Sequence, residues 1–294
     1  MVEKDWWYSK NNIFEMNSDE IAEWLTKTDI VLVPIGSCEQ HGPHLPISTD
    51  SLAAWITTKW AAEKAGVLHT PLVWTGYSPH HMRPPGRGAG TITLRASTFL
   101  EFLYDIGRSL IHHGFNKIVY VTGHTSNIKV IEPALRRLRY DTGALAVLFR
   151  ADAEFIPLVK EIREEVIENP PEENPGWHGS EVETSLVLMY NPEEVKWDEA
   201  KKAITHAPNW LPKDKFTKKD GNPYVAFKGQ ESMIMIPMEH HEYSDTGIIG
   251  NPTRAKVEKA EKIYEIVANK FADFLGELKK IKVEIKNREF VDRI

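Results

Sequence analysis

Short, continuous apolar runs mark the predicted strands. Residues 30–35 read Ile-Val-Leu-Val-Pro-Ile, residues 117–122 read Lys-Ile-Val-Tyr-Val-Thr, and a third run covers residues 144–149. Apolar runs of this length, without alternation, are typical of strands buried on both faces. Gly36 and Gly123 follow the first two runs, and each predicted strand ends there.

Helical patterns separate and follow these runs. Apolar residues at helical spacing predict a helix that begins with a capping box of Thr98 and Glu101 and stops at Gly114, and another over residues 128–138. A last helix is predicted from Asn251 as its N-cap, with Pro252 at its first position. Helix and strand in alternation predict an α/β fold with a mostly parallel sheet covered by helices.

The composition suits one large folded unit. The 294 residues are 41% hydrophobic and 27% charged, which allows a substantial core and argues against wholesale disorder. We expect a single α/β domain over residues 1–294, with elaborated loops around residues 168–180 and 205–245. Within the second loop region, the charge run at residues 213–220 is expected to be solvated.

Charge and cysteine content exclude several partners. The net charge of -6 leaves no basic excess for a phosphate backbone, so nucleic acid is not expected. No apolar stretch approaches the ~20 residues needed to span a bilayer, and residues 1–5 lack a signal-peptide pattern. Cys38 is the only cysteine, so no internal disulfide can form. A cytoplasmic protein without a membrane partner is expected.

The densest group of chemically reactive residues directly follows the first predicted strand. Glu39 and His41 are two positions apart, so both project to one side of an extended backbone. Gly42-Pro43 can then turn the chain and return Asp50 to the same place. An imidazole with two carboxylates suits zinc, manganese or iron. The alternative is a solvated turn that happens to contain these residue types.

Two later segments occupy comparable positions. His124 follows the second buried strand, so it should face the same crevice beyond the carboxyl ends of the strands. Glu183 lies in the first turn of an apolar helix, five residues after His178. Taken singly, His124 could be a buried structural histidine and Glu183 a carboxylate favoured by the helix dipole. Three such segments at strand ends or helix starts favour a shared metal site.

At this point the chain resembles the creatininase (creatinine amidohydrolase) family. The resemblance implies a three-layer α/β/α fold, a centre of two divalent metal ions per chain (Zn, Mn or Fe) and closed homo-oligomers, with hexamers favoured. The motifs that carry it are Glu-Gln-His-Gly-Pro-His-Leu-Pro at residues 39–46 with Thr49-Asp50, Ser-Pro-His-His-Met at 78–82, Gly123-His124 with Asn127, Glu-Thr-Ser at 183–185, and Thr-Gly-Ile-Ile-Gly-Asn-Pro at 246–252.

The resemblance also implies roles for the five candidate ligands. Carried over by position, Glu39 and His124 would bind one metal, His41 and Glu183 the other, and Asp50 would bridge them. Two cations that share a carboxylate can hold a hydroxide between them and polarise a carbonyl oxygen.

Further residues are expected around the substrate. His178 matches the proton-transfer residue of the family, and a histidine with a near-neutral pKa suits that task. Trp177 beside it is expected to wall the pocket. His80 and His81 are expected to line the pocket, with a structural role in their loop as the alternative.

Two departures from the family pattern bear on the substrate. Creatinine-cleaving members carry an acid two positions after the histidine that matches His124, whereas this chain has Ser126, which we expect to contact the substrate. The turn at residues 83–87, Arg-Pro-Pro-Gly-Arg, is unusually basic. Both favour a hydroxyl-rich ring such as a diketo-inositol over creatinine. An amidohydrolase acting on a cyclic amide or formamide is the alternative.

Other candidates and other classes of protein remain. Cys38 adjoins Glu39 but is expected to be a packed side chain rather than a thiolate ligand. The segment Glu239-His240-His241-Glu242 is a rival metal cluster by composition. A non-catalytic sugar-binding module would hold no transition metal, and a purely structural metal site would have a closed coordination shell.

Overall fold

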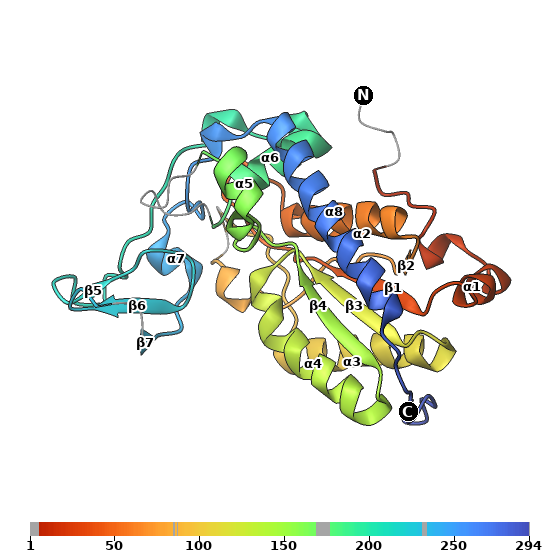
Figure 1. The fold of residues 1–294 in the computed structure, drawn as a ribbon. Helices are drawn as coiled ribbons and strands as arrows, with labels where there is room; N and C mark the ends of the chain where they lie inside the picture. Colours follow the sequence, from red (N-terminus) through yellow and green to blue (C-terminus); the bar gives the residue numbers. More distant parts are fainter. Residues whose placement is uncertain (1–5, 85, 87, 169–176, 231–233, 294) are drawn as a thin grey trace.

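A parallel sheet forms the centre of the computed structural model, which describes residues 6–84, 86, 88–168, 177–230 and 234–293. Its four strands have the order β2-β1-β3-β4 (Figure 1). The register pairs Ile30 with Lys117 and Lys117 with Leu145, so the three long strands end level with one another. The strands are β1 (Ile30–Ile35), β2 (Leu68–His69), β3 (Lys117–Thr122) and β4 (Leu145–Arg150).

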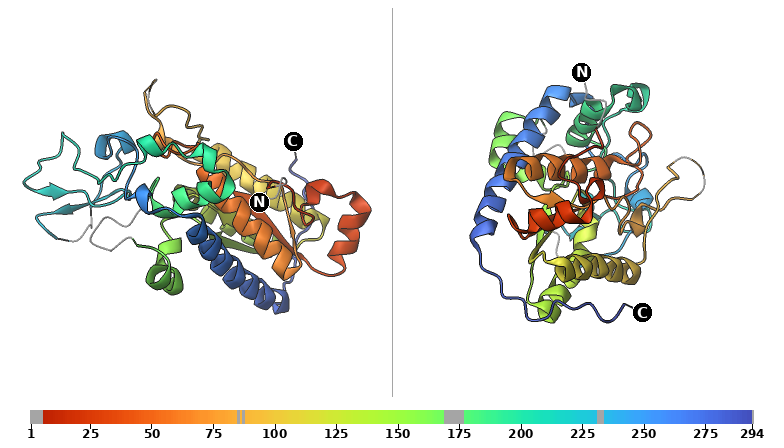
Figure 2. Two further views of the ribbon diagram at one scale, coloured as in Figure 1. Left: turned by 90° about the horizontal axis from the view of Figure 1, so that it is seen from above. Right: turned by 90° about the vertical axis from the view of Figure 1, so that its right-hand side faces the viewer.

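Helices cover both faces of this sheet (Figures 1 and 2). On one face lie α2 (Thr49–Ala65), α6 (Glu181–Tyr190) and α8 (Val257–Lys280). On the other lie α3 (Ala96–His113) and α4 (Ile128–Thr142). The remaining helices are α1 (Ser18–Leu25), α5 (Lys160–Glu165) and α7 (His240–Tyr243). The predicted three-layer α/β/α architecture is confirmed.

Alternate residues of β1 supply the two halves of the core. Leu32 packs in one cluster with Phe271 of α8, whereas Val33 packs in the other with Phe99 of α3. Successive side chains of a strand point to opposite faces, so an unbroken apolar run is what a doubly covered strand needs.

Two predicted helix starts are displaced. Helix α3 begins at Ala96, and Arg95 takes the N-cap position without a side-chain hydrogen bond, so Thr98 and Glu101 do not form the expected capping box. Asn251 caps a short 3-10 turn, Pro252–Arg254, by accepting a hydrogen bond from the Thr253 N–H. Ala255 is extended, so the chain changes direction before α8 begins.

The region from residue 205 to 245, predicted to be loops, contains a small antiparallel sheet beside α7. Its strands β5 (Phe216–Thr217), β6 (Tyr224–Phe227) and β7 (Ile234–Met235) lie at one end of the molecule, away from the central sheet (Figure 1). Strands of this length are too short to show a periodic pattern. Of the other predicted loop, residues 169–176 lie outside the described residues.

Lys218 corrects the expectation of a wholly solvated charge run. Its side chain is fully buried, and its ammonium donates to the backbone carbonyls of Asp220 and Asn222 and lies 4.7 Å from the centre of the Tyr243 ring. A lysine tolerates burial when carbonyl oxygens and an aromatic face replace water around the ammonium. The resulting tight loop brings Asn222 to the cavity described below.

None of the helices in the described ranges is long and apolar enough to cross a membrane.

Candidate metal centre

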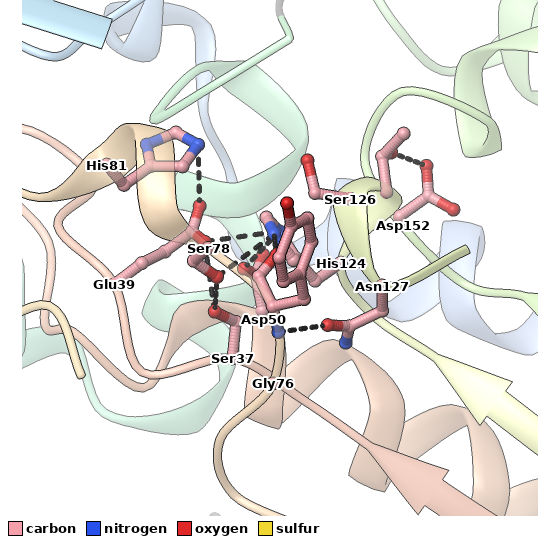
Figure 3. A network of polar contacts seen from close by, with 12 residues as sticks. Ser37, Glu39, Asp50, Gly76, Ser78, His81, His124, Ser126, Asn127 and Asp152 are labelled. Atoms are coloured by element: carbon pink, nitrogen blue, oxygen red, sulfur yellow. Dashed lines mark hydrogen bonds and ion pairs between the residues drawn. The ribbon is translucent and has the colours of Figure 1, made fainter. Parts of the chain in front are cut away.

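The five candidate ligands converge beyond the carboxyl ends of β1 and β3. Glu39 and His41 follow β1, His124 follows β3, and Asp50 and Glu183 lie in the first turns of α2 and α6. Figure 3 shows Glu39, Asp50 and His124 pointing toward one another. All five residues are buried, with exposed fractions from 0% to 6%.

Asp50 stands between two groups of donor atoms. Its Oδ2 lies 3.1 Å from His124 Nδ1, which is 3.2 Å from Glu39 Oε2. Its Oδ1 lies 3.3 Å from His41 Nε2, which is 3.4 Å from Glu183 Oε1. Each group therefore offers three donor atoms within 4.8 Å of one another, and both groups use Asp50.

Small and amide residues permit this convergence. A Cβ at Gly123 would lie 2.1 Å from the carbonyl oxygen of Asp50, so only glycine lets the first turn of α2 pack against the end of β3. Asn127 joins three segments: its Nδ2 donates to the Gly36 carbonyl at 2.9 Å, and its Oδ1 accepts from the Tyr77 N–H at 2.8 Å. The strand ends and α2 are thus fixed relative to one another before any ion binds.

Backbone carbonyls determine which nitrogen of each ligand histidine faces the site. His41 Nδ1 lies 3.1 Å from the Glu39 carbonyl, and His124 Nε2 lies 3.3 Å from the Tyr77 carbonyl. A carbonyl only accepts hydrogen bonds, so each of these nitrogens carries a proton, and the opposite nitrogen, which faces the carboxylates, is the one that a metal ion would bind. In the described part of the chain, His41 Nε2 and Asp50 Oδ2 are buried without a hydrogen-bond partner. A divalent cation in each donor group would satisfy these atoms, His41 Nε2 in one group and Asp50 Oδ2 in the other.

The pKa values of the candidate ligands also favour a metal site. Burial by itself lowers the pKa of His124, but the carboxylates of Glu39 and Asp50 raise it to about 9. Burial likewise opposes protonation of His41, yet Asp50 and Glu183 raise its pKa well above the usual value. Burial, and then the charge of Asp50, raise the pKa of Glu39. In the metal-free protein, bound protons compensate the negative charge of these carboxylates. Metal ions that bind here would displace those protons.

The predicted substrate-contacting residues line one cavity of about 330 Å³ above the ligands. His80, His81, Trp177, His178 and Ser126 all contribute to its wall. Its remaining lining includes Met235 and Met238, from the small sheet and the segment after it. His80 Nε2 lies 3.5 Å from Ser126 Oγ. The structure therefore brings these five residues together around one cavity, and their contact with a substrate stays a prediction.

His178 turns one defined nitrogen to the centre. Its Nε2 lies 2.7 Å from the carbonyl oxygen of Gln40, so Nε2 carries the proton. The opposite nitrogen, Nδ1, lies 3.7 Å from Glu39 Oε1. Any proton that His178 exchanges with the site therefore moves at Nδ1.

The side chains of the alternative metal cluster at residues 239–242 do not all point to the same place in the structure. Glu239 and His241 are exposed, whereas His240 is buried beside His81 and His178. In the sequence, the composition of the segment does not distinguish His240 from its neighbours, so His240 was not predicted on its own. No periodic pattern separates one inward side chain from its neighbours in a helix of four residues.

Glu154 was also missed. It lines the cavity after β4, where burial, and then the charge of Asp152, raise its pKa to about 8. Glu154 follows the end of a third parallel strand, as Glu39 and His124 follow the ends of two others. This position in the sequence could have identified it as a cavity residue.

Two other candidates point elsewhere. Cys38 is buried, its Sγ donates to the Gly90 carbonyl at 3.6 Å, and no donor group found in the described ranges includes it. Arg83 does not line the cavity but donates to the carbonyls of Ser244 and Asp245, at 2.7 and 3.2 Å. Arg87 lies outside the described residues.

The family model for creatinine amidohydrolase matches residues 14–275. The chain belongs to the creatininase family. The 3-dehydro-scyllo-inosose hydrolase of Thermotoga maritima is 27% identical over 252 residues, which cover 84% of this chain and 76% of that protein. The creatinine amidohydrolase of Pseudomonas putida is 29% identical, over 84% of this chain and 89% of its own. The mycofactocin precursor peptide peptidase of Mycolicibacterium smegmatis is 28% identical, over 83% of each chain.

Solved structures of creatininases share the fold. A manganese creatininase superposes with a TM-score of 0.69 at 25% identity, over 93% of this chain and 100% of that one. A creatininase mutant of Zn-Zn type has the same TM-score, identity and coverage. This member of the creatininase family is therefore a metal-dependent hydrolase, which confirms the enzyme class and the use of divalent metal predicted from the sequence.

Proposed function

We propose that this creatininase-family protein opens a small polar ring by hydrolysis at a carbonyl. The substrate that fits best is a diketo-inositol, 3-dehydro-scyllo-inosose, cleaved to an open-chain keto-acid in inositol catabolism. The observation that carries the proposal is the pair of donor groups that share Asp50 at the base of the cavity.

In this proposal the five ligands would divide between two ions. Glu39 and His124 would hold one, His41 and Glu183 would hold the other, and Asp50 would serve both. Divalent ions of zinc, manganese or iron supply Lewis acidity for the carbonyl and lower the pKa of a water. The chain itself fixes the imidazole tautomers through the Glu39 and Tyr77 carbonyls, so the ligands are preorganised.

His178 moves the proton. Water oxygen bonds to the ring carbonyl carbon, and His178 Nδ1 takes a proton from that water. The bond between this carbon and the adjacent ring carbon then breaks, and its electron pair passes to that adjacent carbon, next to the second carbonyl. The proton on Nδ1 is delivered there, so His178 returns to its starting state and the products are a carboxylic acid and a ketone in one chain.

The cavity wall supports a neutral, hydroxyl-rich substrate. Burial lowers the pKa of His80 to about 3 and that of His81 well below the usual value, so both rings are neutral hydrogen-bonding groups. Ser126 stands where creatinine-cleaving members carry an acid. The Thermotoga maritima relative, named as an inosose hydrolase, supports the same substrate class.

An amidohydrolase acting on a cyclic amide or formamide is the second candidate. The Pseudomonas putida relative, a creatinine amidohydrolase, supports it at 29% identity. In that reaction His178 would deliver its proton to the departing nitrogen instead of carbon.

A comparison of kcat/KM for the two candidate substrates tests the assignment. We expect the Zn²⁺- or Mn²⁺-loaded protein to convert 3-dehydro-scyllo-inosose to a keto-acid with a kcat/KM well above that for creatinine. Ser126→Glu, compared with Ser126→Ala as a control for loss of the hydroxyl, should move this ratio toward creatinine. Faster turnover of creatinine by the unchanged protein would reverse the order of the two candidates.

A further inference from the structure

We infer that Glu154 and Lys129 form a hydroxyl-binding subsite in the wall of the cavity, which holds the part of the substrate ring that the metal centre does not. The inference deepens the proposed function and rests on it for the substrate class, a neutral ring that carries hydroxyl groups. Glu154 is a member of none of the metal-donor groups found in the described part of the chain.

Both residues reach the cavity from the ends of the central strands. Glu154 follows β4, and Lys129 lies in the first turn of α4, shortly after β3. They line the same cavity of about 330 Å³ as four of the five candidate metal ligands. A small ring held at the base of this cavity by a carbonyl group would therefore present its hydroxyl groups to the surrounding wall.

The arginine nearest in sequence to Glu154 is engaged by another carboxylate. Arg150 Nε lies 2.9 Å from Asp152 Oδ2, and Arg150 Nη2 lies 2.8 Å from Asp152 Oδ1. Thr125 Oγ1 donates to the same Oδ1 at 2.6 Å. Among the residues that the structure describes, no direct ion pair joins Glu154 to an arginine or a lysine. Its carboxyl group is therefore available to a ligand in the cavity.

The surroundings of Glu154 favour a ligand that donates hydrogen bonds. Burial, and then the charge of Asp152, raise the pKa of Glu154 to about 8, although the hydroxyl of Thr125 opposes this change. The protein thus supplies too few donors to stabilise the ionised carboxylate fully. In either protonation state the carboxyl group accepts hydrogen bonds, so hydroxyl groups of a ligand would supply the missing donors.

Lys129 provides the complementary group. Burial lowers the pKa of its ammonium, and the charge of Glu154 opposes that change, so the two groups are close enough to interact. Both line the cavity without forming a direct ion pair in the described chain, which lets one ligand contact both. A hydroxyl group both donates and accepts, so hydroxyls on adjacent ring carbons can donate to Glu154 and accept from Lys129.

The combination favours a ligand that is neutral overall. An anion would be repelled by the carboxylate of Glu154, and a cation by the ammonium of Lys129. Ser126 lies one helical turn before Lys129, and its Oγ is 3.5 Å from His80 Nε2 in the same cavity wall. These uncharged groups add hydrogen bonds for hydroxyls rather than for separated charges, so a polyol fits better than a zwitterion.

Binding of scyllo-inositol provides the test, because this ring carries a hydroxyl group on every carbon and has no carbonyl to be hydrolysed. Calorimetric titration of the Zn²⁺-loaded protein measures the affinity without turnover. We expect Glu154→Gln and Lys129→Met each to weaken binding about 10-fold or more, as for loss of a hydrogen bond to a charged group. Glu132→Gln is the control, at an exposed glutamate of α4 that pairs with Arg136 outside the cavity, and should bind as the unchanged protein does.

The outcomes separate this subsite from the proposed function. Equal affinity of Glu154→Gln and the unchanged protein for scyllo-inositol, or no binding by the unchanged protein, would overturn the subsite. Tighter binding of creatine, a zwitterion whose charges could pair with the same two residues, would overturn the preference for hydroxyl groups. If Glu154→Gln does not fold, Lys129→Met decides by the same criterion. The proposed function fails separately, when the loaded protein binds scyllo-inositol yet does not convert 3-dehydro-scyllo-inosose.

Discussion

Oδ2 of Asp50 lies 3.1 Å from Nδ1 of His124, although one side chain belongs to the first turn of α2 and the other follows β3. The absence of a side chain at Gly123 allows this approach. The other oxygen of Asp50 lies 3.3 Å from His41 Nε2, so a single carboxylate serves both imidazoles. We therefore expect the binding of both metal ions to depend on Asp50.

Asp50→Asn is expected to remove both metal ions. An amide cannot supply two anionic oxygens, so each donor group would keep only two of its three members. Metal content per chain, measured by mass spectrometry, should fall from two toward zero. Asp152→Asn is the matched control, because Asp152 is a buried aspartate that lines the same cavity but belongs to neither group. Retention of two ions in Asp50→Asn would contradict the bridging role.

His178→Ala should bind both ions and fold, yet turn over slowly. General acid–base groups contribute about 10²–10⁴-fold, and the loss should fall on kcat more than on KM. The measurement is the single-turnover rate on the substrate that the unchanged protein cleaves, with metal content determined on the same sample. Full metal content with an unchanged rate would reject the proton-transfer role and direct attention to His81.

The metal-free protein should become less stable as the pH rises. The pKa of His124 is raised to about 9 in the folded state, with Glu39 and Asp50 favouring the proton against burial. The unfolded value is ~6.5, so the stabilisation is complete below that pH and disappears as the pH rises through about 9. The raised pKa of Glu39 acts with the same sign.

Urea unfolding of metal-free and Zn²⁺-loaded samples, followed across this pH range, measures the effect. Metal displaces the protons, so the loaded protein should lose stability toward acidic pH instead. A metal-free protein whose free energy of unfolding rises between pH ~6.5 and ~9 would contradict the assignment.

Gly247→Ala should disturb the hydrogen bond of 2.8 Å between Gln40 Nε2 and His240 Nδ1. A Cβ at residue 247 would lie 2.1 Å from Gln40 Oε1, and the backbone there has a φ of +86°. We expect a loss of about 1–3 kcal/mol from backbone strain plus a further loss from the displaced amide. Gly229→Ala is the control, with a φ of +74° and no atom within 4 Å of its Cβ. Equal losses in both variants would show that the contact with Gln40 contributes nothing.

We expect the protein to form a closed homo-oligomer, with a hexamer favoured. Ile204, Trp210 and Met235 are large apolar side chains with exposed fractions of 65%, 54% and 53%. A contact between subunits would cover such side chains, and most homo-oligomers have closed symmetry. Sedimentation at micromolar concentration provides the measurement, and a monomer would count against the expectation.

Local patterns in the sequence were sufficient to predict two long strands of the central sheet. The apolar runs at residues 30–35 and 117–122 became β1 and β3 with unchanged bounds, because doubly buried strands require side chains of one kind. The start of α8 was displaced, since Asn251-Pro252 favours any turn that begins with a capped N–H, and the local sequence does not distinguish a 3-10 turn from a long helix.

The sequence by itself determined the fold class and placed Glu39, His41 and His124 after buried strands and Glu183 in the first turn of a helix, whereas the helix α2, whose first turn holds Asp50, was not predicted. That placement follows from parallel strands, whose carboxyl ends meet at one edge of a sheet. Only the tertiary structure decided which nitrogen of each imidazole faces the centre, because the Glu39, Tyr77 and Gln40 carbonyls that hold the outer protons come from backbone geometry. It also selected His240 and excluded Glu239 and His241, since the inward direction of a side chain in a single helical turn depends on what packs against it.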